Sequence, residues 1–146
     1  MINCKFENGN KASLRHVTVG LIAVKGNQIL LEKRAMHLTN PGLYCIPGGY
    51  LDRDETLKDA VIRELLEETG YEGKIIKLIR IVDTPNRPKE DRQNVDFVYL
   101  VEVGEKVGDG DNESSEVSWF DLNNLPPAGE FAFDHYEDIE YYLQSC

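Results

Sequence analysis

The sequence predicts an α+β fold, an α/β/α sandwich in which a mixed β-sheet lies between helices. Short apolar segments rich in β-branched residues predict strands, and two longer segments have the features of helices. These elements follow one another without a regular β–α–β alternation, which favours a mixed sheet over a parallel one. The length of 146 residues and the hydrophobic content of 41% suit one globular domain, so we expect residues 1–146 to form a single domain.

Five segments are expected to form strands. Residues 17–24 and 28–33 flank the tight turn Lys25-Gly26-Asn27, so they should pair as a hairpin. The later strands are expected at 74–82, 95–103 and 117–120. The polar stretches 35–47, 83–94 and 104–115 are expected to be loops, because proline, glycine and acidic residues interrupt them.

Two segments are expected to form helices. Thr56 is a suitable N-cap, and Asp59, three residues later, completes a capping box. Gly70 is a suitable end for this central helix, because glycine adopts the left-handed backbone at a helix C-terminus. A second helix is expected at 134–144, close to the end of the chain.

The central helix has two faces of opposite character, since an α-helix advances about 100° per residue. One side is expected to pack on the sheet through Val61, Ile62, Leu65 and Leu66. The other side has Glu64, Glu67 and Glu68, with Ala60 among them to leave room. Acids spaced like these repel one another, and near the helix C-terminus they oppose the helix dipole. A hard divalent cation would relieve this repulsion; the alternative is an ordinary solvated acidic face.

Composition excludes several classes of function. Sixteen basic and 26 acidic residues give a net charge of −10, which disfavours duplex nucleic acid as a partner. Cys4, Cys45 and Cys146 are odd in number and far apart, so neither a disulfide framework nor a zinc site fits. No apolar run approaches the roughly 18 residues of a membrane span. The polar segment 1–13 lacks the features of a signal peptide, so we expect a cytoplasmic protein.

The segment from Gly49 to Tyr71 resembles the Nudix box at each of its fixed positions. Gly49 is followed after five residues by Glu55 and, after seven more, by the run RELLEETGY at 63–71. Tyr71 stands where an aliphatic residue is more usual, and Pro47-Gly48-Gly49 is similar to the family's usual lead-in. Chance would give such a match with odds on the order of 10⁻⁶ or less. The detailed resemblance covers about residues 44–71 and extends loosely to the flanking strands and Trp119-Phe120.

The resemblance to the Nudix family implies metal-dependent hydrolysis of a phosphoanhydride bond. It implies that three glutamates hold Mg²⁺ or Mn²⁺, together with the carbonyl of Gly49; these are Glu64, Glu67 and Glu68. Glu55 would pair with Arg63 and fix the preceding loop against the helix. The general base would be a box glutamate such as Glu67, or a glutamate on a distant loop. Glu116 is the leading loop candidate, and Glu113 is the alternative.

Several residues are candidates for binding the substrate. Arg34, at the end of a strand, and Arg87, in the loop 83–94, could contact phosphate; Lys89 and Arg92 add charge to that loop. Tyr44, Phe97 and Tyr99 could stack on a base, although aromatic residues in strands usually belong to the core. The histidines do not lie in any metal-ligand spacing, so no role is expected for His16, His37 or His135.

The expected substrate is a small nucleotide, a nucleoside diphosphate linked to another moiety, with ADP-ribose the leading candidate. Pro85 and Pro88 lie near the position where ADP-ribose hydrolases of the family often have a proline. One alternative is a nucleoside triphosphate or a dinucleotide. The other is a nucleotide-binding module without catalysis, which the intact acids of the helix disfavour. The resemblance further implies that a homodimer is one assembly open to this chain.

Overall fold

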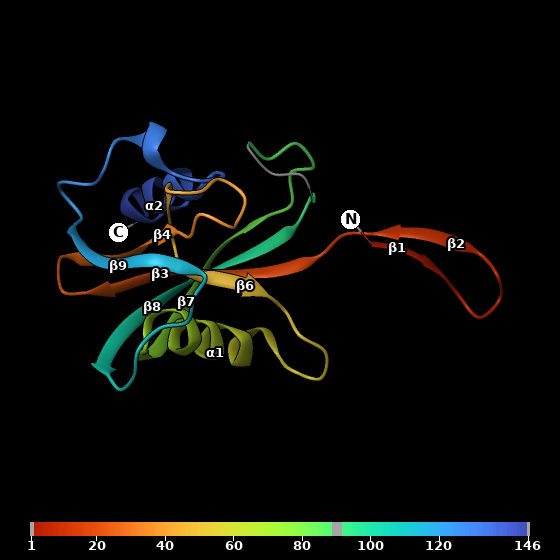
Figure 1. Cartoon of the computed structure of the whole chain (residues 1–146), viewed down its shortest axis with the longest axis horizontal. Helices are drawn as coiled ribbons and strands as arrows, with labels where there is room; N and C mark the ends of the chain where they lie inside the picture. Colours follow the sequence, from red (N-terminus) through yellow and green to blue (C-terminus); the bar gives the residue numbers. More distant parts are fainter. Residues whose placement is uncertain (1, 89–91, 146) are drawn as a thin grey trace.

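The computed structural model describes residues 2–88 and 92–145, and shows a mixed sheet that is covered by helices on both faces (Figure 1). Lys89 and Cys146 lie outside the described residues. The strands of the main sheet are β3 (Val17–Lys25), β4 (Gln28–Arg34), β5 (Tyr44–Cys45), β6 (Gly48–Tyr50), β7 (Tyr71–Val82), β8 (Val95–Lys106) and β9 (Ser114–Asp121). Their order is β5-β4-β3-β8-β7, with β6 paired to β3 and β9 paired to β4. β3 and β8 run parallel, whereas β3 and β4 form the predicted antiparallel hairpin.

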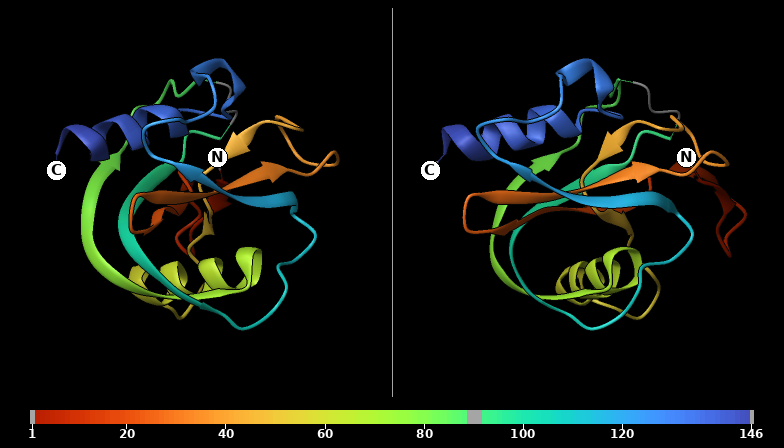
Figure 2. Two further views of the ribbon diagram at one scale, coloured as in Figure 1. Left: turned by 90° about the vertical axis from the view of Figure 1, so that its left-hand side faces the viewer. Right: turned by 60° about the vertical axis from the view of Figure 1, so that its left-hand side comes forward.

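Helices α1 (Leu57–Thr69) and α2 (His135–Gln144) lie on opposite faces of the sheet, as Figures 1 and 2 show, and the short 3₁₀ helix η1 (Ala128–Glu130) precedes α2. The core is accordingly divided into two buried clusters. Leu21 of β3 belongs to the cluster under α1, and its neighbour Ile22 belongs to the cluster that includes Ile139 of α2. Because successive side chains of a strand point to opposite faces, β3 supplies both clusters. The predicted sandwich is confirmed.

Helix α1 begins and ends where the sequence predicts. The Asp59 amide donates to the Thr56 hydroxyl at 3.2 Å, and the Thr56 amide donates to the Asp59 carboxylate at 3.1 Å. This is the reciprocal pair of a capping box. Gly70 has φ of 74°, and its amide donates to the Leu66 carbonyl. The ends of the helix are therefore set by local contacts.

The apolar side of α1 is narrower than predicted. Ala60, Val61 and Leu65 are fully buried, whereas Ile62 and Leu66 are 37% and 42% exposed. The expectation that Ile62 and Leu66 hold the helix on the sheet is wrong. The buried stripe instead continues through two of the acids, because Glu64 and Glu68 are only 8% and 6% exposed. The helix is rotated so that these carboxylates, rather than two aliphatic side chains, face the sheet.

The N-terminal segment forms a hairpin that the sequence did not predict. Strands β1 (Ile2–Lys5) and β2 (Lys11–Leu14) pair with each other in a separate two-stranded sheet, which extends away from the sandwich in Figure 1. The segment is short and polar, so it gave no periodic signal. Two predicted loops are shorter than expected, because β5 lies within 35–47 and the ends of β8 and β9 lie within 104–115. Among the described helices, none is long and apolar enough to cross a membrane.

Candidate active site

Arg63 ties the loop before α1 to the acidic face of the helix. Its Nε and Nη2 donate to the two carboxylate oxygens of Glu55 at 3.1 and 2.7 Å, which is the predicted pair. Its Nη1 donates to Glu64 Oε1 at 2.7 Å and to Glu67 Oε2 at 3.0 Å, and Nη2 reaches the Tyr50 carbonyl at 3.0 Å. The hydrogen bond from Arg63 lowers the pKa of Glu55. One guanidinium group therefore sets the positions of three carboxylates.

Two glycines bring the backbone of β6 onto these acids. The Gly48 amide donates to Glu68 Oε2 at 2.7 Å. A Cβ on Gly49 would collide with the carboxylate of Glu64, and a Cβ on Gly48, whose φ is 151°, would collide with the Val19 carbonyl. A side chain on Gly48 would push β6 away from β3, and a side chain on Gly49 would displace the Glu64 carboxylate. Glycine is therefore required here for the close approach of the backbone to the carboxylates.

The acids of α1 meet a further acid from the sheet. Burial raises the pKa values of Glu64 and Glu68, and the charge of Glu32 raises that of Glu68 further. Glu32 lies on β4 and is 3% exposed; burial and the charge of Asp111 raise its pKa to about 8. Crowded carboxylate oxygens, one of them buried without a hydrogen-bond partner among the described residues, are a donor set that suits a hard divalent cation. Sequence reasoning missed Glu32, although an acid within the apolar strand 28–33 was a signal.

A cavity of about 560 Å³ joins the acids to a group of cationic and aromatic side chains. Its size is that of pockets that bind small molecules. Glu64, Glu67 and Glu68 line it, as does Gly49. Further lining residues include Arg34, Tyr50, Arg63, Arg87, Arg92, Asp111, Glu113 and Phe133. The structure thus brings most of the predicted site residues together around one cavity.

The two predicted phosphate-binding arginines are held in place by other groups. Arg34 Nε donates to the Thr39 carbonyl at 2.7 Å, and its guanidinium lies 5.1 Å from the centre of the Phe133 ring. Arg87 is 7% exposed, and its Nε donates to Asp134 Oδ2 at 2.9 Å. Both guanidinium groups line the cavity in fixed orientations.

Some predicted residues lie elsewhere. The Tyr44 ring packs against Phe120, with ring centres 5.2 Å apart, and Tyr44 does not line the cavity. Tyr99 is buried in the cluster under α1, and Phe97 packs against that cluster. Glu116 is on β9 outside the cavity lining, and its Oε1 accepts a hydrogen bond of 2.6 Å from the Ser118 hydroxyl.

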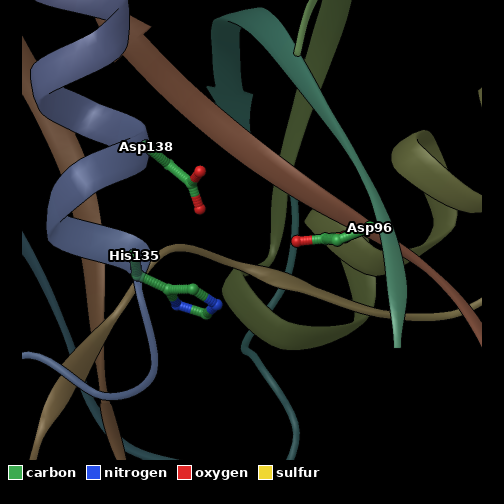
Figure 3. Close-up of side chains that lie close together, drawn as sticks. All are labelled: Asp96, His135 and Asp138. Atoms are coloured by element: carbon green, nitrogen blue, oxygen red, sulfur yellow. The ribbon is translucent and has the colours of Figure 1, made fainter. Parts of the chain in front are cut away.

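A second group of polar side chains is visible only in the folded chain. Asp96, His135 and Asp138 point toward one another in Figure 3, each with one ligand atom within 4.8 Å of the others, a geometry compatible with a metal ion. The Ile46 amide donates to His135 Nδ1 at 3.2 Å, and burial lowers the pKa of His135 to about 3. Arg80 forms an ion pair of 3.5 Å with Asp138. Sequence reasoning assigned no role to His135, and the residues that join it in this group are distant from it in sequence.

Comparison with known proteins identifies the family. The family model "NUDIX domain" matches residues 14–141. An ADP-ribose pyrophosphatase from Methanocaldococcus jannaschii is 39% identical over 132 residues, which are 88% of this chain and 73% of the relative. A putative 8-oxo-dGTP diphosphatase from Bacillus subtilis is 33% identical over 73% of this chain and 66% of its own length.

A solved structure of a NUDIX hydrolase shares the fold of this chain. The crystal structure of a NUDIX hydrolase from Nitrosomonas europaea superposes with a TM-score of 0.79, covering 99% of this chain and 85% of the other at 23% identity. That likeness concerns the fold alone. The family model matches residues 14–141, and this range contains the glutamates of α1, Arg63 and the residues that line the cavity. The chain belongs to the Nudix family and is a pyrophosphohydrolase.

Proposed function

We propose that this enzyme uses Mg²⁺ or Mn²⁺ to cleave the phosphoanhydride bond of a nucleoside diphosphate linked to another moiety, with ADP-ribose as the favoured substrate. The observation that carries the proposal is the single cavity, in which the acids of α1 and three further arginines, Arg34, Arg87 and Arg92, share one lining. Carboxylates suit the metal, and guanidinium groups suit the phosphates. The name of the Methanocaldococcus relative, ADP-ribose pyrophosphatase, supports the substrate class.

The metal contributes charge and an activated water. Nudix hydrolases generally need a divalent metal, and such an ion, when bound, neutralises phosphate oxygens and lowers the pKa of water. In this proposal Glu64, Glu67 and Glu68 hold it, with the carbonyl of Gly49. Arg63, held by Glu55, orients two of these carboxylates through the hydrogen bonds described above.

The remaining cavity residues bind and orient the substrate. Arg34 and Arg87 are already held by Thr39 and Asp134, so little conformational entropy is lost when they meet phosphate. Phe133 and Tyr50 line the cavity and are better placed than Tyr44 to contact a base or a sugar. The loop 83–94 contributes Arg87, Arg92 and Asn94 to the lining, which supports a role for this loop in binding the second moiety.

We propose Glu113 as the general base, in preference to Glu116. Glu113 lines the cavity, and its charge raises the pKa values of Glu64 and Glu68, so it lies near the acids of α1. We expect Glu113→Gln to lower kcat by ~10²-fold or more with little change in KM, and Glu116→Gln to retain activity. Steady-state kinetics of both variants test this. If kcat falls in Glu116→Gln and is unchanged in Glu113→Gln, the general base is Glu116. If kcat is unchanged in both variants, the base is one of the glutamates of the box.

The substrate class is tested with a panel read by product identity. ADP-ribose and each nucleoside triphosphate are incubated with the enzyme at equal concentration. We expect AMP and ribose 5-phosphate from ADP-ribose, with kcat/KM at least ~10-fold above that of any triphosphate. Such a ratio requires only about 1.4 kcal/mol of differential transition-state binding. Preferred release of pyrophosphate from a triphosphate would overturn the substrate assignment and leave the family chemistry intact.

A triphosphate substrate is the second candidate, and the similarity to the Bacillus protein named a putative 8-oxo-dGTP diphosphatase favours it. A binding module without catalysis is disfavoured because the carboxylates of α1 are intact and crowded. We also propose that residues 1–146 form a single domain, that the protein is cytoplasmic and that it can assemble as a homodimer. Light scattering on the purified chain tests the homodimer, and a monomeric mass at all concentrations would contradict it.

A further inference from the structure

Glu32 is a buried acid that the motif of α1 does not account for. We propose that Glu32 is a further carboxylate of the divalent-metal centre, acting with Glu68 and Glu64. The inference rests on the proposed function, because it requires a metal at the glutamates of α1. It assigns a residue of the sheet, outside the Nudix box, to metal binding.

The fold places Glu32 beside the acids of α1. In the sheet it lies opposite Cys45 of β5 and Val117 of β9. Burial raises the pKa of the Cys45 thiol, and the charges of Glu32 and Glu68 raise it further, so both carboxylates lie near this thiol. The charge of Arg34, which lines the cavity, lowers the pKa of Glu32, so Arg34 also lies near this carboxylate. Leu30, two residues before Glu32 on β4, belongs to the cluster under α1, so Glu32 lies on the face of the sheet that meets α1.

One oxygen of the Glu32 carboxylate lacks the hydrogen-bond partner that a buried polar atom needs. Oε1 is buried without a hydrogen-bond partner among the described residues, which is costly for any polar atom. The charged groups that shift the pKa of Glu32 are mostly acids. Asp111, Glu64 and Glu113 raise this pKa, and the cation Arg34 lowers it. A buried oxygen among like charges gains most from a cation. A hard divalent cation is the partner whose chemistry matches this set.

The alternative is that Glu32 keeps a proton and serves only to pack β4. The two roles predict different effects of Glu32→Gln, which keeps the shape of the side chain. A packing role leaves metal affinity unchanged. A metal-binding role weakens metal affinity by at least ~10-fold, the size of effect known for groups that support metal ligands. Stability without metal should hold or rise in that case, because glutamine cannot carry the buried charge.

The test measures Mn²⁺ binding directly. The Kd of Mn²⁺ is determined by calorimetry for the wild type, Glu32→Gln and Glu102→Gln, and melting temperatures are recorded with and without Mn²⁺. Glu102 is the matched control, since it is also a strand glutamate but is exposed on β8. We expect a Kd at least ~10-fold higher and a smaller Mn²⁺-induced shift in Tm for Glu32→Gln, with Glu102→Gln equal to the wild type.

Each outcome bears on a separate claim. Wild-type Mn²⁺ affinity in Glu32→Gln overturns the inference and leaves the proposed function standing. A wild-type chain that binds no Mn²⁺ overturns the proposed function and the inference together. If Glu32→Gln does not fold, Glu32→Asp takes its place, because it keeps the charge and withdraws the carboxylate by one methylene. Weakened binding in Glu32→Asp supports the inference, and unchanged binding contradicts it.

Discussion

Removal of divalent metal by a chelator is expected to abolish ADP-ribose hydrolysis and to leave the enzyme folded. The loss should be ~10³-fold or more, because the charge stabilisation that a metal provides at a phosphoanhydride is worth several kcal/mol. Without it, the carboxylates at the cavity repel the phosphates of the substrate. Burial raises the pKa values of Glu32, Glu64 and Glu68, and the charge of Glu113 raises each of them further, so several acids lie together in this region.

The fold should survive chelation because apolar contacts hold α1 on the sheet. Ala60, Val61 and Leu65 are fully buried in the cluster that also contains Leu21 of β3. Activity is measured before and after exhaustive chelation and again after Mg²⁺ or Mn²⁺ is restored, while far-UV circular dichroism monitors the helices. Full turnover in the chelated enzyme would refute the metal mechanism. Loss of the helical signal would show that metal, rather than the apolar cluster, holds α1.

The substitution Glu68→Gln is expected to lower kcat by at least ~10²-fold, which is the usual loss for a positioned group that stabilises charge. Glu68 is 6% exposed and its Oε2 accepts the hydrogen bond from the Gly48 amide. Glutamine can still accept that hydrogen bond through its amide oxygen, so the backbone of β6 should stay in place. The variant therefore removes charge with little change in shape.

Without metal, Glu68→Gln should be as stable as the wild type or more stable. Burial, and then Glu32, raise the pKa of Glu68 above its ordinary value of 4.5. A raised pKa in the folded state means that wild-type stability falls as the pH rises from about 4.5 through the folded-state pKa. Glutamine has no ionisable carboxyl group, so the variant does not lose this stability as the pH rises. The difference in melting temperature between variant and wild type should consequently be larger at pH 8 than at pH 5.

The matched control for this variant is Glu105→Gln. Glu105 is exposed at the end of β8, where it lies 4.0 Å from the Lys25 ammonium, and a surface pair of this kind contributes little to stability. Its kcat and melting temperature should equal those of the wild type. A near-normal kcat for Glu68→Gln, measured at saturating Mg²⁺, would show that Glu68 is not a metal ligand.

Contacts between residues near in sequence could be predicted. The capping box of Thr56 and Asp59 spans three residues, and the left-handed cap at Gly70 depends on a single backbone conformation. The pair of Glu55 and Arg63 spans eight residues and followed from the resemblance to the family motif. The alternation of short apolar segments likewise predicted the strands, because side chains on a strand repeat every two residues.

Contacts between distant segments were decided by the tertiary structure. The position of Glu32 among the acids depends on how β4 pairs with β5 and β9, and His135 meets Asp96 only when α2 packs on the sheet. The path of the loop before β9, which hydrogen-bonds through Glu113 to Ala35, places Glu113 rather than Glu116 at the cavity.

The sequence by itself determined the helix with its glutamates, the glycines that approach them and the sandwich of strands and helices. The rotation of α1 was settled by packing on the sheet, which buried Ala60 and two glutamates and left Ile62 and Leu66 exposed. Local patterns report the preferences of one segment, whereas side-chain burial depends on the surface that the segment meets. That surface is built by strands that lie far apart along the chain, and for this reason the folded structure was needed to place Glu32 beside the glutamates of α1.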